Sequence, residues 1–237
     1  MTISPVSQDV SAERALIRIG ALSAIAGAII FMIANIAHPR SPNIEVTRAQ
    51  IETVAASSIW MSDHLVLFFS GLLLLVGLVA IQRSIPSGPG AAWAQLGSLA
   101  AVVSTSVWAV LMALDGITSK VIHNAWAAAP KAQKAAALRV AEMMEEIDIG
   151  IFSIYIILFF GLTFLLYGLA VAMSESYPKW LGWVAVVLAL ASLIVGIVQA
   201  FTGLSVLVTN TLFASFSSLL TLWVLIMGIL TWRKTKA

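Results

Sequence analysis

The chain has 237 residues, of which 60% are hydrophobic and 10% are charged, and its mean hydropathy is +1.00. A soluble domain of this size carries about 25% charged residues, so this composition excludes a water-soluble globular protein and requires that much of the surface faces lipid. The formal net charge is +2 without a dense basic run, which argues against nucleic acid as a partner, and the absence of cysteine excludes disulfides, thiolate metal sites and cysteine nucleophiles.

The N-terminal segment, residues 1–14, is polar and contains Asp9 and Glu13. A signal peptide needs a basic start and a short apolar core, so we expect the first apolar stretch, Ile19–Ala37, to be retained as a membrane anchor. A proline cannot continue the hydrogen bonding of a helix, so we expect this helix to end at His38-Pro39.

Three further uncharged stretches are long enough to cross a bilayer, which needs roughly 20 apolar residues. They are Leu65–Gln82, a stretch from Ala91 to Leu114, and Ile149–Ser174. The proline- and glycine-rich residues 86–90 precede the second of these and predict a turn, so we expect that helix to begin near Ala91.

The last apolar stretch, Trp180–Trp232, has 53 residues without a charge or a histidine. One helix of that length would reach about 80 Å, far beyond a hydrocarbon core of ~30 Å, so we expect a turn near Thr202-Gly203. The sequence therefore predicts an all-α bundle of six transmembrane helices in one domain, residues 15–232. Residues 1–14 form a cytoplasmic N-terminal segment in this interpretation, and residues 233–237 form a basic cytoplasmic tail.

Basic residues near the ends of the helices set the orientation of a membrane protein. With both termini in the cytoplasm, the inner side holds seven basic residues and the outer side holds six, and the outer six are diluted by acids. The inner seven are Arg14, Arg18, Arg83, Lys179, Arg233, Lys234 and Lys236. This distribution, with its basic C-terminus, predicts a multi-pass protein of the plasma membrane with cytoplasmic ends.

Two longer segments lie on the predicted outer side. The first, Ser41–Ser62, mixes apolar and polar residues, and the second, Ala125–Met144, is rich in alanine, which favours a helix. We expect both to form amphipathic helices on the outer face, with the second lying on the membrane surface.

The ionisable residues of the predicted outer side give the main functional signal. All three histidines, His38, His64 and His123, are expected there, at the same depth as several acids. Asp115 stands near the membrane edge, where an acid is costly unless it is paired or hydrated. It shares a helix face with Ser119 and His123 if the helix continues that far.

We therefore predict an outward-facing polar site in which Asp63, His64, Asp115 and Glu146 bind a ligand. Imidazole and carboxylate groups also suit zinc or non-haem iron, and the metal-ligand candidates are His38, His64, Asp115 and Glu146. Structural interpretations compete with these assignments, because acids favour the start of a helix and histidine and tryptophan anchor helices at lipid headgroups. The sequence identifies neither a catalytic residue nor a cofactor.

Three classes of function remain open at this stage. The leading one is a membrane protein that binds a small amphipathic or lipid-like ligand in the outer site. The alternative is a membrane-embedded enzyme, metal-dependent or an acid-catalysed isomerase or cyclase, that acts on an apolar substrate. The third is a structural partner subunit. The lipid bilayer is the one partner that all three share, and each is compatible with an oligomer.

Three short stretches resemble a bacterial family of six-helix membrane proteins described only as a domain of unknown function. They are Trp60-Met61-Ser62-Asp63-His64, Ala113-Leu114-Asp115-Gly116 and Tyr177-Pro178-Lys179-Trp180-Leu181-Gly182-Trp183. The resemblance covers residues 15–232. It implies the six-helix architecture and a bacterial plasma membrane, and it implies no activity.

Overall fold

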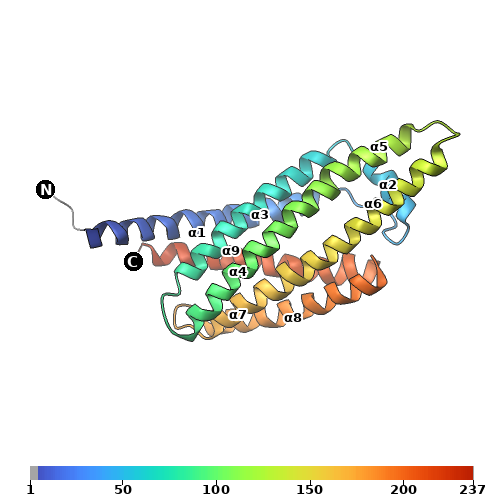
Figure 1. The fold of residues 1–237 in the computed structure, drawn as a ribbon. Helices are drawn as coiled ribbons and strands as arrows, with labels where there is room; N and C mark the ends of the chain where they lie inside the picture. The colour runs from blue at the N-terminus through green and yellow to red at the C-terminus, as the bar shows by residue number, and fades with distance from the viewer. Residues whose placement is uncertain (1–4, 237) are drawn as a thin grey trace.

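The computed structural model describes residues 5–236, which form a bundle of long helices with no strand among them (Figure 1). The helical elements are α1 (Pro5–Ala37), α2 (Thr47–Ala56), α3 (Trp60–Arg83), α4 (Gly88–Leu111), η1 (Met112–Ser119), α5 (Lys120–Ala128), α6 (Lys134–Tyr155), η2 (Ile156–Thr163), α7 (Phe164–Ala172), α8 (Lys179–Thr202), η3 (Val206–Phe213) and α9 (Ala214–Lys234). The three η elements are π-helical.

Six continuous helical rods within residues 5–236 are long and apolar enough to cross a membrane. The first four correspond one by one to the first four predicted spans. The last two come from the single apolar stretch Trp180–Trp232, and the predicted turn near Thr202-Gly203 separates them: α8 ends at Thr202 and η3 begins at Val206. The third and fourth rods, Gly88–Ala128 and Lys134–Ala172, each contain a π-helical segment within an otherwise α-helical run. The structure thus confirms the all-α class and the six spans.

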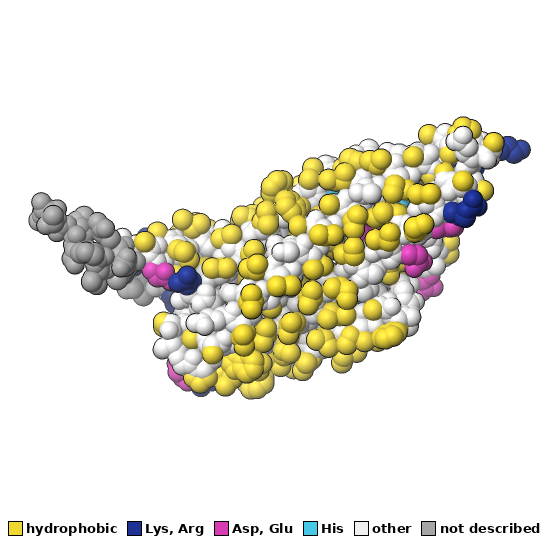
Figure 2. Space-filling model, viewed as in Figure 1, with side chains coloured by type: hydrophobic (Ala, Val, Ile, Leu, Met, Phe, Trp, Pro, Cys, Tyr) yellow, Lys and Arg dark blue, Asp and Glu magenta, His cyan; other side chains and the backbone are white. Residues whose placement is uncertain are grey.

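The two ends of the bundle are different in composition. The start of α1 and the end of α9 lie at one end of the bundle, together with the α3–α4 and α7–α8 connections, and the α5–α6 hairpin and α2 lie at the other (Figure 1). The space-filling view shows charged side chains mainly at the two ends and hydrophobic side chains over the region between them (Figure 2). This distribution is the one that a bilayer imposes on helices that cross it.

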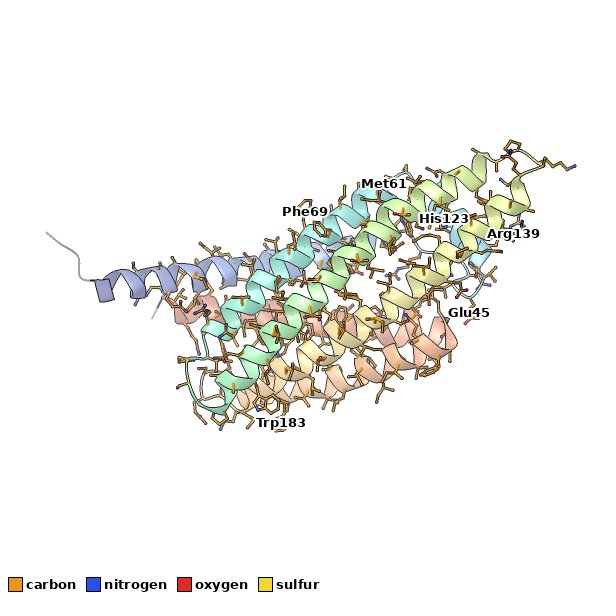
Figure 3. The ribbon with its side chains drawn as sticks, in the orientation of Figure 1. Glu45, Met61, Phe69, His123, Arg139 and Trp183 are labelled. Carbon is orange, nitrogen blue, oxygen red and sulfur yellow. The ribbon has the colours of Figure 1, made fainter. Side chains whose placement is uncertain are left out.

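Two local predictions differ from the structure. The third span begins at Gly88 rather than near Ala91, because Pro89 stands in the first turn of α4, where its missing N–H costs no helical hydrogen bond. Residues 125–144 are not one helix lying on the membrane surface. They form a hairpin whose arms, α5 and α6, continue the third and fourth spans beyond the bundle (Figure 3), and the turn falls at Ala129–Gln133.

Small residues allow the helices to approach closely, as they do in many membrane proteins. Gly77 of α3 packs on the backbone of Ala24 in α1, and Gly182 of α8 packs on the backbone of Ala172 in α7; a Cβ atom at either glycine would overlap its neighbour. These glycines therefore allow α3 to lie close against α1 and α8 close against α7.

A buried tyrosine, Tyr177, links the segments at the end of the bundle that carries the α3–α4 and α7–α8 connections. The hydroxyl of Ser84 donates to the carbonyl of Ile81, so the Tyr177 hydroxyl donates to Ser84 and accepts from Thr231 at 2.7 Å. Burial raises the pKa of Tyr177 above that of a free tyrosine, although its two hydrogen bonds act in the opposite direction. The phenol therefore stays neutral and links α3, the α7–α8 connection and α9.

The topology predicts which single cysteines a membrane-impermeant maleimide labels from the same side. The natural chain has no cysteine, so each introduced thiol reports alone. We expect Asn43→Cys and Ala129→Cys to be labelled from one side of the membrane, and Ser87→Cys and Ser176→Cys only from the other, because an even number of spans separates the members of each pair. Labelling of Ser87→Cys and Ala129→Cys from the same side would contradict the fold.

Candidate functional site

A cavity of about 470 Å³ lies inside the half of the bundle that carries α2. Its deeper part is lined by aromatic and aliphatic side chains, namely Phe31, Leu67, Trp108, Leu111, Phe152, Tyr155, Phe160 and Phe213. Its outer part, which we call the mouth, is lined by the ionisable groups His38, Arg40, His64, Asp115, Glu145 and Asp148. The cavity is therefore amphipathic, with an apolar floor and a charged mouth.

All three π-helical segments contribute to the wall of this cavity. Met112 and Asp115 come from η1, Phe160 from η2, and Thr209 and Phe213 from η3. A π-helical turn forms i→i+5 hydrogen bonds and often occurs at functional sites. Because the wider turn shifts the helical register, each segment changes which side chains face the centre of the bundle.

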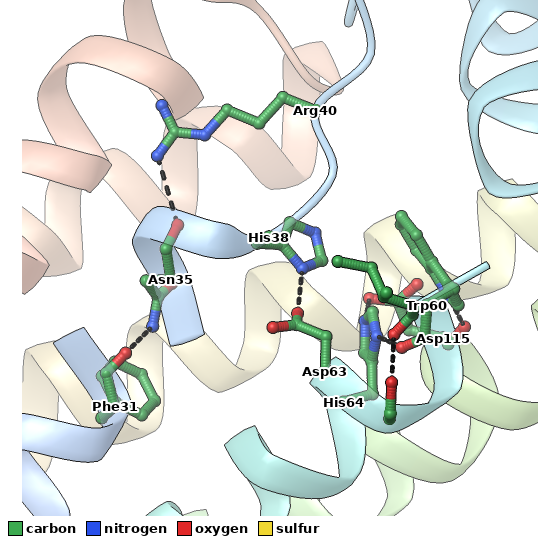
Figure 4. Close-up of polar contacts among 10 residues, drawn as sticks. Phe31, Asn35, His38, Arg40, Trp60, Asp63, His64 and Asp115 are labelled. Carbon is green, nitrogen blue, oxygen red and sulfur yellow. Dashed lines mark hydrogen bonds and ion pairs between the residues drawn. The ribbon is translucent and has the colours of Figure 1, made fainter. Parts of the chain in front are cut away.

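His38 and Asp63 form the first of three pairs between a histidine and a carboxylate. His38 follows the last residue of α1, Asp63 lies in the first turn of α3, and His38 Nδ1 is 2.7 Å from Asp63 Oδ2 (Figure 4). The carboxylate of Asp63 is almost fully buried, whereas about a quarter of the His38 side chain is accessible. A short charge-assisted hydrogen bond of this kind orients both side chains.

The second pair joins His64 of α3 to Asp115 of η1. His64 Nδ1 lies 2.7 Å from the carbonyl oxygen of Trp60, and His64 Nε2 lies 2.9 Å from Asp115 Oδ2. A carbonyl oxygen can only accept, so Nδ1 carries a proton. The contact between Nε2 and the carboxylate then requires a second proton between them, and the pair as a whole carries no net charge.

Trp60 holds this second pair in place. Its indole Nε1 donates to the backbone carbonyl of Asp115 at 2.8 Å, and its ring lies 4.7 Å from the ring of His64, centroid to centroid. Trp60 and His64 are four residues apart on α3, which places them on one face of the helix. Trp60 therefore joins the start of α3 to the π-helical segment of the third span, and it fixes the position of both members of the pair.

The third pair is formed by His123 of α5 and Glu145 of α6. His123 Nε2 is 3.2 Å from Glu145 Oε1, but the geometry is not that of a hydrogen bond, and Nε2 has no other partner. His123 is fully buried, lies between α5 and α6 (Figure 3), and does not line the cavity. Asp148, one turn further along α6, does line it, and its Oδ1 atom is buried without a hydrogen-bond partner.

The acids of the mouth have no lysine or arginine partner among the described residues. The ion pairs of Asp63, Asp115 and Glu145 are all with histidines, and the arginine and lysine ion pairs of residues 5–236 are formed by other acids. Arg40 lines the cavity, but its guanidinium donates to the carbonyl of Asn35. The negative charge of these carboxylates must therefore be balanced by protons or by a bound cation.

The structure brings together most of the residues that the sequence suggested. His38, His64 and Asp115 line the cavity, and Asp63 lies directly behind His38. Glu146 is exposed on α6 and does not line the cavity; its neighbour Glu145 does. The expected shared face of Asp115 and His123 is not observed, because the π-helical segment turns Asp115 toward α3 while His123 faces α6.

Sequence reasoning missed Glu145 and Asp148 as lining residues, and it also missed the aromatic floor. The sequence predicts a span that begins at Ile149, and a carboxylate at 145, 146 or 148 would suit its start equally well. Because α6 begins at Lys134, these acids lie well inside a helix, and packing decides which of them faces the cavity. The rings of Trp108 and Tyr155 stack with their centroids 4.6 Å apart. Both residues lie in continuous apolar stretches, whose sequence does not show which face of the helix points to the cavity.

The short helix α2 covers this end of the bundle. Gln50, Thr53 and Val54 of α2 line the cavity. Lys120 of α5 donates to the carbonyls of Val54 and Ala55 at 2.8 Å each, so a cation caps the C-terminal end of α2. Ile51 packs with Trp126 and Ala141 of the α5–α6 hairpin. These contacts hold α2 against the hairpin and close the outer wall of the cavity.

Comparison of the chain with protein families, with curated proteins and with solved structures finds no match. The resemblance to a six-helix family of unknown function therefore stays a prediction. The geometry of the cavity is therefore the only guide to its function.

The contact between η1 and α3 can be tested at Gly116. A Cβ atom at this position would overlap the Cβ atom and the ring of His64. We expect Gly116→Ala to destabilise the protein by about 1–3 kcal/mol, the usual cost of overpacking, seen as a lower melting temperature in detergent.

The matched control for this substitution is Gly150→Ala in α6, where an added Cβ meets no atom within 4 Å. Alanine favours a helix over glycine by up to about 1 kcal/mol, so the control should melt at the same temperature as the natural protein or higher. Equal melting temperatures for the two variants would show that η1 and α3 are not in close contact.

Proposed function

We propose that this integral membrane protein binds a small amphipathic ligand, with its apolar part on the aromatic floor of the cavity and its polar group at the mouth. The observation that carries the proposal is the division of the cavity into these two parts. Ligand sites in proteins are mostly apolar concavities with a few well-placed polar groups, and a volume of about 470 Å³ is in their usual range.

The acids of the mouth favour a ligand with a cationic group. Asp115, Glu145 and Asp148 line the cavity without a lysine or arginine partner among the described residues. An amine at the mouth would find carboxylates to pair with and aromatic rings to contact, an arrangement that recognises ammonium groups. An anionic headgroup would lie beside the same carboxylates, and among residues 5–236 Arg40 is the one lysine or arginine that lines the cavity.

The lipid bilayer offers a route to the cavity. Ile36, near the end of α1, lines the cavity and is also 79% exposed on the bundle surface, and Asn210 of η3 lines the cavity and is exposed as well. The wall between α1 and η3 therefore reaches the outer surface of the helices. An amphipathic molecule could enter there from the membrane with its apolar part leading.

We further propose that the mouth faces the outside of a bacterial plasma membrane and that both termini are cytoplasmic. The support is the basic C-terminus, Arg233, Lys234 and Lys236, because basic residues are retained on the cytoplasmic side. Labelling of Ala129→Cys and Asn43→Cys in intact cells, without labelling of Ser176→Cys, is the result this orientation requires.

A second candidate is a membrane-embedded enzyme acting on an apolar substrate. The observation that favours it is the His64–Asp115 pair, which shares a proton beside the apolar floor. A group that can give and take a proton at the end of an apolar cavity suits acid-catalysed isomerisation or cyclisation. A product formed from the bound molecule would distinguish turnover from binding.

Photolabelling tests the binding proposal. The probe is dodecylamine carrying a diazirine near the end of its alkyl chain, applied to protein in nanodiscs and competed by unlabelled dodecylamine. We expect saturable labelling of peptides from η2 and from η3–α9, and weaker competition by dodecanoate. We expect Ala214→Trp, which adds bulk to the cavity wall, to weaken binding at least about tenfold, equivalent to about 1.4 kcal/mol.

The control variant is Leu219→Trp on the same helix, at a side chain that is 47% exposed and does not line the cavity. It should bind the probe as the natural protein does. Labelling that dodecylamine does not compete, or equal binding by both tryptophan variants with unchanged melting temperatures, would refute the cavity as a ligand site.

A further inference from the structure

The strongest arrangement beyond the apolar cavity is the convergence of two imidazoles and a carboxylate at its mouth. His38, Asp63 and His64 each offer one ligand atom, and these three atoms lie within 4.8 Å of one another. The residues come from the end of α1 and the start of α3, which are separate helices that the fold brings side by side (Figure 4). We propose that these three residues bind a divalent transition-metal ion, with zinc as the first choice.

The set of donor atoms selects the class of metal. Two imidazole nitrogens and one carboxylate oxygen suit zinc and ferrous iron, whereas magnesium and calcium prefer oxygen ligands alone. Around a four-coordinate zinc with bonds of 2.0–2.1 Å, neighbouring ligand atoms are about 3.3 Å apart. The separation of up to 4.8 Å between the three atoms is close enough for side-chain rotations to complete the site.

The charge of the surroundings points to a cation independently of this geometry. Asp63 is 8% exposed, and the Asp115 carboxylate lies 2.9 Å from His64 Nε2. Neither acid forms an ion pair with a lysine or arginine among residues 5–236. With both histidines neutral, the two carboxylates leave a charge of −2, which one divalent ion balances. Metal binding would replace the protons that the histidine–carboxylate pairs now share.

The outer contacts of the site are those of a metal centre. A histidine ligand commonly donates its second ring N–H to a backbone carbonyl, which fixes its tautomer and orientation. His64 Nδ1 donates in this way to the carbonyl of Trp60 at 2.7 Å, which leaves Nε2 as the nitrogen able to offer a lone pair. Asp115 supplies a second carboxylate next to that nitrogen, as a positioning residue.

The site has an open side toward the cavity. His38 and His64 line it, and three protein ligands leave a position on a tetrahedral ion for water or another ligand. Metal binding goes beyond the proposed ligand binding and does not depend on it. A titration with the metal ion alone tests this site without the amphipathic ligand, so either proposal can fail while the other stands.

The experiment uses full-length protein purified in detergent without a histidine tag, stripped with a chelator and then titrated with Zn²⁺ or Co²⁺. We expect one ion bound per chain, measured by elemental analysis after gel filtration, and visible cobalt absorption of the intensity typical of four coordination. Mg²⁺ should not compete. His64→Gln and Asp63→Asn should each lose stoichiometric binding, and Asp115→Asn should weaken it by roughly 10–100-fold, as loss of an outer-shell partner does.

The chain provides a matched control in the third histidine–carboxylate pair. His123 also contacts a carboxylate, at 3.2 Å, but no third ligand lies near it among the described residues. His123→Gln should therefore bind metal as the natural protein does. A natural protein that binds no zinc or cobalt at micromolar concentrations, or an equal loss in His123→Gln, would overturn the proposal in favour of pairs that share protons only.

A ligand substitution guards against variants that lose the metal because they misfold. The chain has no cysteine, so His38→Cys introduces its only thiol. If residue 38 coordinates the metal, the cobalt form of this variant gains a thiolate-to-cobalt charge-transfer absorption that the natural protein lacks. The same variant without that absorption, while it still binds cobalt, would show that position 38 is not a ligand and would refute the three-residue site.

Discussion

A hydrocarbon layer can neither solvate a charge nor satisfy an unpaired backbone group, and the rest of this structure depends on that constraint. It makes every crossing a helix, and it moves ionisable side chains to the ends of the rods. Because the helices return to the same two surfaces, residues far apart in the chain meet at one depth. His38, Asp63 and Asp115 come from three different segments, and they lie together because lipid leaves them few other places.

The same constraint explains why the mouth of the cavity has such an unusual composition. A carboxylate in this position needs a partner, and here the partners are imidazoles rather than lysines or arginines. An ammonium or guanidinium holds its proton near neutral pH, whereas an imidazole can give its proton up. A mouth built from histidine–carboxylate pairs can exchange protons for another cation, which a mouth built from permanent ion pairs could not do.

The architecture follows from the sequence because long uncharged stretches have one physical solution. Trp180–Trp232 had to turn once, and Gly203, with a positive φ of 74°, lies where it does so. The site followed only in part. The sequence predicts the depth of His64 and Asp115 in the membrane. It does not predict the direction of each side chain, because direction depends on helical register. Glu145 and Glu146 differ by one position, and tertiary packing alone decides that the first lines the cavity.

Register was least predictable where the helices are π-helical. Asp115 and His123 are eight residues apart, which an α-helix would place on nearly one face, and η1 separates them. No composition signal marks η1 beyond the glycine at 116, whose role is to admit His64. The apolar floor was equally hidden, since an aromatic residue facing lipid and one facing a cavity have the same neighbours in the sequence.

The π-helical segment η1 also makes the site sensitive to the length of the chain. Each residue of an α-helix advances the chain by about 100° around its axis. A π-helical turn holds one residue more than an α-helical turn, so removal of one residue would convert η1 into regular helix and change which of its side chains face α3. The contact between Asp115 and His64 would then be lost, although Lys120 of α5 would keep its place against the carbonyls of α2. An insertion or a deletion in η1 would therefore disturb the site even when every side chain that lines the cavity is kept.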